Sequence, residues 1–305
     1  MKTNFFNICR IYVLSKITSN KKQKHYKDKF TNIKNDMISK YMQIITSSIK
    51  ESLPENNDIL SKILYASSLH KDTFEKYKNQ YTDQSVAIIA SGPSLNYANE
   101  IKCDCIGVNR AFLHPTIKIK YLFAIDYMAI KSYIEEILKY PDIEKFYGYF
   151  YTSTPYTKMM IPDSVALRHN AQRFVSMPIW YDNEQRNFGY NPDIARMPLH
   201  GYSSSVFCAL QFAFYTNPKK IYLYGCDTSD AGHAYGANKK ITSDNILLMK
   251  KEWNIIKKIA PVFYPETEII SVNPVGLKGM FHDVYTKSYL QDHPEIDIQK
   301  VEILE

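Results

Sequence analysis

The sequence is short of glycine, and its few glycines form none of the common nucleotide-binding fingerprints. It has 10 glycines in 305 residues, and neither Gly-x-Gly-x-x-Gly nor a P-loop lysine motif occurs. The five cysteines are an odd number without a Cys-x-x-Cys pair, which favours a reduced protein over a disulfide framework. No run approaches the ~18 apolar residues of a membrane span, and no signal-peptide pattern opens the chain. We therefore expect a cytoplasmic globular protein.

Positive charge is concentrated at the start of the chain. Residues 1–80 carry 15 Lys and Arg against 7 Asp and Glu, a net charge of +8, while the remainder carries 23 against 24. The first 80 residues also contain no glycine, and apolar residues recur at helical spacing between Ile33 and Ile49. These patterns predict a helical, basic N-terminal region over 1–80 and a separate domain over 81–305.

Two interpretations of the basic region stay open. A cluster of lysines around Lys21–Lys29 suits an anchor to an anionic membrane surface or to a partner, formed by residues 1–50. The protein would then be peripheral on the inner face of the membrane. The alternative is a solvated helical cap that packs on the second domain.

From residue 85 onward, apolar strand-like runs alternate with helical patterns. This alternation predicts an α/β fold, a Rossmann-like, mainly parallel sheet with helices on both faces. The expected helices cover 127–139, 203–215 and 244–259. The expected strands are Val86–Ala90, Cys105–Asn109, Tyr121–Ile125, Phe146–Tyr151, Arg173–Met177, Ile221–Tyr224 and Glu268–Val272.

The stretch from Ser85 to Leu95 dominates this pattern. A continuous β-branched run leads into Ser91-Gly92-Pro93-Ser94, which is typical of a central parallel strand that ends in a tight turn. Because Gly92 has no Cβ and Pro93 fixes φ, a ligand could approach the backbone closely here. The turn is a candidate nucleotide or phosphate site, and a plain β-turn is the alternative.

Polar residues follow five of the expected strands directly. In a parallel sheet the carboxyl ends of the strands share one edge, where ligands bind. The five residues are Ser91, Asn109, Asp126, Asp227 and Asn273. In addition, three hydroxyls open the apolar helix at Ser203, Ser204 and Ser205, where free N–H groups suit a phosphate. Each of these residues could instead be only a turn or capping residue.

Four of these motifs together resemble the bacterial sialyltransferases of glycosyltransferase family 42. They are Ala90-Ser91-Gly92-Pro93-Ser94-Leu95, Asn109-Arg110, Ser203-Ser204-Ser205 and Ile221–Asp227. The layout is also similar to a wider group that includes hydroxymethylpterin diphosphokinase-like proteins and motility accessory factors. The resemblance covers about residues 85–285.

The resemblance implies a transferase that moves a sugar from a CMP-activated donor to a cell-surface glycan, without a metal or cofactor. It implies that the nucleotide is held by Ser91, Gly92, Pro93, Ser94, Asn109, Ser203, Ser204 and Ser205. The position of Asp126 at a strand end makes it a further nucleotide-binding candidate. His233 would be the general base, with Tyr235 and Asp227 as further catalytic residues. The donor sugar, sialic acid or a related acidic sugar, stays open, as does a homo-oligomeric state. The expected partners are a nucleotide sugar and a glycan, and no nucleic acid.

Chemistry supports these roles without the family. Histidine has an ordinary pKa near neutrality and suits the deprotonation of an acceptor hydroxyl. Tyrosine hydroxyls, here those of Tyr202 and Tyr235, and helix N–H groups can stabilise a departing phosphate. Two alternatives remain: a diphosphokinase-like phosphotransferase with ATP and Mg²⁺ held by Asp227, Asp230 and His233, and a non-catalytic nucleotide-binding relative.

Overall fold

The computed structural model describes residues 57–98, 100–150, 160–177, 191–201, 204–234 and 242–304. The compact unit that contains the sheet runs from Lys62 to Glu305. Residues 1–56 lie outside the described part, and with them the predicted anchor over 1–50. Within the described residues, no helix is both long and apolar enough to cross a membrane.

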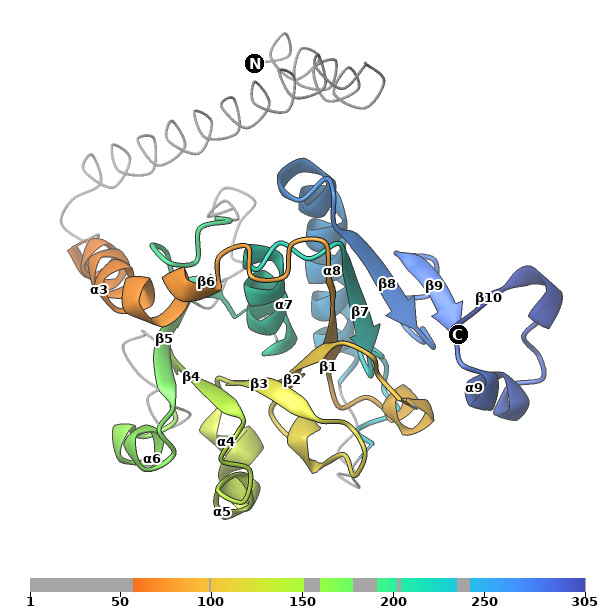
Figure 1. Ribbon diagram of the computed structural model, residues 1–305, viewed down its shortest axis with the longest axis horizontal. Helices are drawn as coiled ribbons and strands as arrows, with labels where there is room; N and C mark the ends of the chain where they lie inside the picture. The colour runs from red at the N-terminus through yellow and green to blue at the C-terminus, as the bar shows by residue number, and fades with distance from the viewer. Residues whose placement is uncertain are drawn as a thin grey trace, which may run out of the picture. The chain divides into compact units, whose positions relative to one another are not determined.

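The described residues form one sheet of ten parallel strands in the order β10-β9-β8-β7-β1-β2-β3-β4-β5-β6 (Figure 1). The strands are β1 Ser85–Ile89, β2 Asp104–Val108, β3 Ile119–Ala124, β4 Glu144–Phe150, β5 Gln172–Met177, β6 Leu199–His200, β7 Lys220–Tyr224, β8 Glu268–Val272, β9 His282–Tyr285 and β10 Glu302–Ile303. The predicted α/β fold with a parallel sheet is confirmed.

The strand order reverses at the centre of the sheet. From β1 the chain adds β2 to β6 outward on one side, and it then returns so that β7 pairs with the free side of β1. The strands β8 to β10 continue outward from β7. The carboxyl ends of β1 and β7 therefore flank the point where open α/β sheets bind their ligands.

Helices cover both faces of the sheet, and alternation along the strands explains why (Figure 1). In β1, Val86 and Ile88 join one core while Ala87 and Ile89 join the other. The first core packs under α3 Asn57–Phe74, α7 Val206–Tyr215 and α8 Ser243–Phe263. The second packs under the short helices η2 Pro93–Tyr97, η3 Ala111–Leu113, α4 Tyr127–Ile130, α5 Ile134–Ile137 and α6 Asp163–Arg168.

Aromatic side chains fill the first core, which accounts for the high phenylalanine content. Phe123 and Phe146 stack with ring centroids 4.7 Å apart, and Phe74 stacks on Phe146 at 5.6 Å. Offset and edge contacts of this kind add about 0.5–1.5 kcal/mol per pair beyond the burial of apolar area. All ten residues of α7 are buried, so this helix lies in the middle of the first core.

The chain before the sheet contributes to this core. Phe74, Tyr77 and Tyr81 are buried in it, although composition alone places Phe74 and Tyr77 in the basic region over 1–80. Their burial gives the end of α3 and the following turn a structural role in the domain.

Several elements differ from the sequence-based prediction. The helix expected over 127–139 is divided into α4, the short 3₁₀ helix η4 Lys131–Tyr133, and α5. The helix α7 begins at Val206, three residues later than expected. The prediction also missed β6, β9, β10, α6 and the terminal helix α9 Lys287–Asp292.

Candidate functional site

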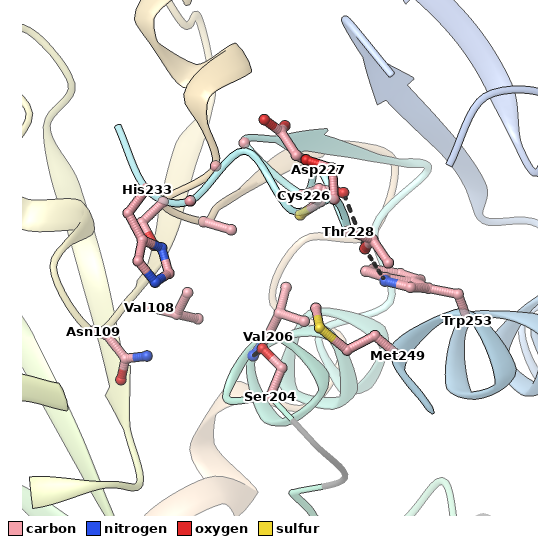
Figure 2. A pocket seen from close by; sticks show the side chains of 16 residues that line it. Val108, Asn109, Ser204, Val206, Cys226, Asp227, Thr228, His233, Met249 and Trp253 are labelled. Atoms are coloured by element: carbon pink, nitrogen blue, oxygen red, sulfur yellow. Dashed lines mark hydrogen bonds between the residues drawn. The ribbon is translucent and has the colours of Figure 1, made fainter. Parts of the chain in front are cut away.

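A pocket lies at the reversal point of the sheet (Figure 2). The ends of β1, β2 and β7 form one side of it, and α7 and α8 contribute the other. Its lining residues are Ala90, Ser91, Gly92, Val108, Asn109, Ser204, Val206, Gly225, Cys226, Asp227, Thr228, Ser229, Gly232, His233, Met249 and Trp253. The structure thus brings six predicted site residues to one place: Ser91, Gly92, Asn109, Ser204, Asp227 and His233.

Backbone hydrogen bonds join the two loops at the pocket beyond the ends of their strands. The N–H of Ala90 donates to the carbonyl of Tyr224 at 2.9 Å, and the N–H of Gly92 donates to the carbonyl of Gly225 at 2.8 Å. Further along, the N–H of Ala234 donates to the carbonyl of Ser91 at 2.8 Å. The turn after β1 and the loop after β7 therefore form one hydrogen-bonded unit that carries His233.

The space beside Gly92, where a ligand was expected to approach the backbone, is filled by Asp227 and Gly225 of the protein itself. A Cβ at this position would lie 2.5 Å from Cγ of Asp227 and 2.6 Å from the carbonyl oxygen of Gly225. Glycine is needed here because the loop after β7 packs directly against the turn. A bulky substitution at Gly92 would therefore disturb the fold itself, in addition to any effect on the approach of a ligand.

Asp227 connects the same two loops through its carboxylate. One oxygen accepts the backbone N–H of Ser94 at 2.8 Å, and the other accepts the Ser94 hydroxyl. Burial raises the pKa of Asp227, and the two hydrogen bonds from Ser94 oppose that rise. In Figure 2 the carboxylate points away from the centre of the pocket. Asp227 thus holds the turn after β1 in place, which differs from the predicted direct catalytic role.

His233 is half-buried at the pocket, and its ring nitrogen Nδ1 lies 3.0 Å from the hydroxyl oxygen of Ser91. Burial lowers the pKa of His233, and the positive charge of Arg110 lowers it further, while a hydrogen bond to the backbone of Ser91 raises it. The imidazole is consequently neutral near pH 7. A neutral imidazole in a pocket can act as a general base.

Asn109 occupies the end of β2 in the left-handed backbone region, with φ of 50°. Asparagine tolerates this conformation better than most residues. Its side-chain oxygen accepts a hydrogen bond from the hydroxyl of Ser205 at 3.3 Å, so the end of β2 is joined to the start of α7. Ser204 lies beside it at the pocket, where its hydroxyl accepts the N–H of Val206 at 3.4 Å.

Other predicted residues lie away from the pocket or outside the described residues. Asp126 accepts the N–H of Met128 at 2.7 Å and caps α4. Asn273 is buried and holds the start of α9 by accepting the N–H of Thr286 at 2.8 Å. Pro93 and Ser94 begin η2 behind the pocket. Ser203, Tyr202 and Tyr235 are outside the described residues.

The apolar wall of the pocket was not predicted. It consists of Val108, Val206, Met249 and Trp253. Trp253 is fully buried, and its Nε1–H donates to the hydroxyl of Thr228 at 3.1 Å, which fixes the loop after β7 against α8 (Figure 2). The spacing of Met249 and Trp253, four residues apart on one face of a helix, was the available signal, but it is equally typical of an ordinary core face.

The proposed metal ligands of the phosphotransferase alternative do not converge. Both carboxylate oxygens of Asp227 are engaged by Ser94, and Asp230 is exposed. Among the described residues, no group of three His, Cys, Asp or Glu side chains is placed to hold a metal ion.

Comparisons with known proteins give weak structural likenesses. No protein-family model matches the sequence, and no curated protein matches it. A MAf glycosyltransferase from Magnetospirillum magneticum AMB-1 is similar over 79% of this chain and 38% of its own, at 12% identity and a TM-score of 0.40. The sialyltransferase CST-II, solved with a trisaccharide acceptor and CMP, is similar over 62% of this chain and 80% of its own, at 14% identity and a TM-score of 0.36.

A second structure of CstII, from Campylobacter jejuni in complex with the substrate analogue CMP-3FNeuAc, is similar at 12% identity and a TM-score of 0.27, over 61% of this chain and 79% of its own. The chain spans little more than a third of the length of the MAf glycosyltransferase. All three TM-scores lie below 0.5.

Proposed function

We propose that this protein is a glycosyltransferase that moves a sugar from a CMP-activated donor to a hydroxyl group of a glycan. The observation that carries the proposal is a half-buried histidine, His233, in the pocket at the strand-order reversal, which Asn109 and Ser204 also line. The motifs that resemble glycosyltransferase family 42 supply Ser91, Gly92, Asn109 and Ser204, four of the residues that meet there.

The proposed reaction begins with proton removal. His233 takes the proton of an acceptor hydroxyl as its oxygen attacks the anomeric carbon of the donor sugar. The bond between that carbon and the phosphate oxygen breaks, and CMP leaves with the electron pair. Because the pKa of His233 lies below its ordinary value of 6.5, the imidazole is unprotonated and ready to accept this proton near pH 7.

The leaving phosphate is assigned to the start of α7. This helix has ten residues, and its N-terminal end carries partial positive charge that stabilises an anion. The hydroxyls of Ser203, Ser204 and Ser205 would add hydrogen bonds, and Tyr235 and Tyr202 are proposed to assist. Asp126 and Asp227 receive no direct role in this proposal, since their carboxylates serve the fold.

A donor-hydrolysis screen tests the proposal. CMP-sugars, other nucleotide sugars and ATP are each compared with and without EDTA, and we expect turnover of a CMP-sugar that survives EDTA. His233→Ala should lower kcat by about 10²–10⁴-fold with donor affinity largely kept. Ser68→Ala, which removes an exposed hydroxyl from α3, is the matched control and should behave as wild type.

The pH profile gives a second measure of the same proposal. The kcat/KM of the wild type should rise with pH through the free-enzyme pKa of His233, with an inflection below 6.5. Two results contradict the proposal: His233→Ala activity within a few-fold of wild type, or activity with ATP that EDTA abolishes and Mg²⁺ restores. The latter would favour the phosphotransferase.

A further inference from the structure

Ser91 stands in an unusual position for a residue expected to bind a nucleotide. Its hydroxyl oxygen lies 3.0 Å from Nδ1 of His233, and its carbonyl accepts the N–H of Ala234, the next residue, at 2.8 Å. The backbone contact fixes the separation of the two loops, and the side-chain contact fixes the orientation of the imidazole. Both contacts come from the same residue.

This geometry assigns different tasks to the two ring nitrogens of His233. Nδ1 is engaged by Ser91, so Nε2 is the nitrogen left to meet an acceptor hydroxyl. A neutral imidazole carries one proton, on one nitrogen only. Nε2 can act as a base only if that proton is on Nδ1, and in this tautomer Nδ1–H must donate to the Ser91 oxygen.

We propose that Ser91 is a positioning residue that accepts the Nδ1–H of His233 and so leaves the Nε2 lone pair free to take the acceptor proton. The proposal rests on the proposed function, which requires His233 to be a base. Ser91 does not touch the reacting atoms in this scheme. It acts through the tautomer and the orientation of the imidazole.

In this arrangement the hydroxyl of Ser91 can still donate its own proton in a second hydrogen bond. A serine hydroxyl has one proton to donate and two lone pairs that accept. While one lone pair accepts from His233, the proton can be donated to an oxygen of the donor phosphate. An anion bound beside Ser91 would thus take up the only proton that Ser91 could give to Nδ1. Donor binding and selection of the basic tautomer are thereby coupled.

Charged groups around His233 do not replace this contact. Arg110, which follows β2, lowers the pKa of His233 but cannot accept a proton from Nδ1. Asp227, on the same loop after β7, has both oxygens engaged by Ser94, and Asp230 is exposed. Ser91 is the partner that the structure gives to Nδ1 of His233 within the described residues.

Nitrogen NMR on full-length protein with labelled histidine tests the proposal without any assay of activity. We expect Nδ1 of His233 to give the shift of a protonated nitrogen and Nε2 that of an unprotonated one, and added CMP should increase the population of this tautomer. Ser91→Ala should shift the population toward the Nε2–H tautomer, and Ser91→Thr, which keeps the hydroxyl, should restore it. Ser68→Ala should leave the His233 signals unchanged.

Kinetics with the CMP-sugar found in the screen provide a second readout. Ser91→Ala should reduce kcat about 10-fold, the lower end of the effect seen when the partner that orients a metal-bound histidine is lost, and Ser91→Thr should recover it. A protonated Nε2 in the wild type, or identical His233 signals in wild type and Ser91→Ala, overturns the proposal even if the sugar is transferred. The expected tautomer without any turnover of a CMP-sugar would instead refute the proposed function and leave the Ser91–His233 contact established.

Discussion

At the scale of single residues, two glycines show that the same residue type can be required for different reasons. Gly92 has φ of −68°, which any residue adopts, but its missing Cβ would meet Asp227 and Gly225. Gly279 has φ of +73°, and a Cβ there would meet nothing within 4 Å. The first glycine is therefore a packing requirement and the second a backbone requirement.

Substituting alanine at each position should separate the two effects. Gly92→Ala should lower the free energy of unfolding by about 1–3 kcal/mol, because the added methyl group meets backbone that cannot move aside easily. Gly279→Ala should cost about 1–2 kcal/mol, the penalty of the left-handed backbone for a residue with a Cβ, with no added clash. Urea unfolding of both variants measures the difference, and a Gly92→Ala variant as stable as wild type would contradict the packing that we describe.

Strand-end polar residues were predictable as a group but not one by one. Ser91 and Asn109 meet because parallel strands end at one edge of the sheet, which follows from the alternation of strands and helices. His233 comes from the loop after β7 and was expected only from the family resemblance. Asp227 could not be assigned from sequence, because its partner Ser94 lies 133 residues away. Asp126 and Asn273 had the same strand-end pattern, and only the structure shows that they cap α4 and hold α9.

At the scale of elements, the sheet was predictable where its strands are apolar and continuous. The central strands β1, β2, β3 and β7 are largely buried. At one edge, β9 begins with the polar pair His282 and Asp283, and β10 has only two residues. Strands this short and polar lack the alternation of apolar and polar residues by which a strand is recognised, so the sequence could not reveal them.

One histidine on β9 connects this strand to its two neighbours, β8 and β10, through side-chain hydrogen bonds. His282 lies at the start of β9, 2.6 Å from a carboxylate oxygen of Glu268 on β8 and 2.8 Å from one of Glu302 on β10. The hydrogen bond to Glu268, followed by that to Glu302, raises the pKa of His282 above its ordinary value of 6.5. These side chains are all partly exposed, so each pair contributes at most about 1 kcal/mol.

The stabilising effect of His282 should depend on pH in a defined direction. Because the pKa is raised in the folded protein, the contribution is complete below pH 6.5 and is lost as pH rises through the folded-state value. We expect the difference in free energy of unfolding between wild type and His282→Gln to be largest in acid and to shrink toward alkaline pH. Urea titrations between about pH 5.5 and 8.5 measure it, and a difference that grows with pH would show that the pair is wrongly assigned.

At the scale of the whole molecule, the position at which the chain can be shortened differs between the sequence composition and the structure. The composition shifts near residue 80, yet Phe74 is fully buried and Tyr77 is 4% exposed in the core. Losing one buried aromatic side chain costs about 3–5 kcal/mol. A chain that starts at residue 81 should therefore not fold, whereas one that starts at Asn57 keeps the whole of α3.

The proposed anchor over residues 1–50 can be tested with that shorter chain. The full-length protein should sediment with anionic liposomes, and binding should weaken with added salt, since the Debye length falls to about 3 Å at 1 M. The variant that lacks residues 1–56 should fold and lose this binding. If it sediments as well as the full chain does, the basic region is not an anchor.

The strand-order reversal also decides when the pocket can exist during synthesis. Ser91 and His233 are separated by 142 positions, and Met249 and Trp253 follow later still. When β1 to β6 have left the ribosome, the growing chain still lacks β7, which pairs with β1 in the finished sheet. Closing so long a loop costs entropy before any contact offsets it. The nascent protein therefore cannot bind its ligand until α8 has left the ribosome, and a chain cut before Trp253 has a sheet without a complete pocket.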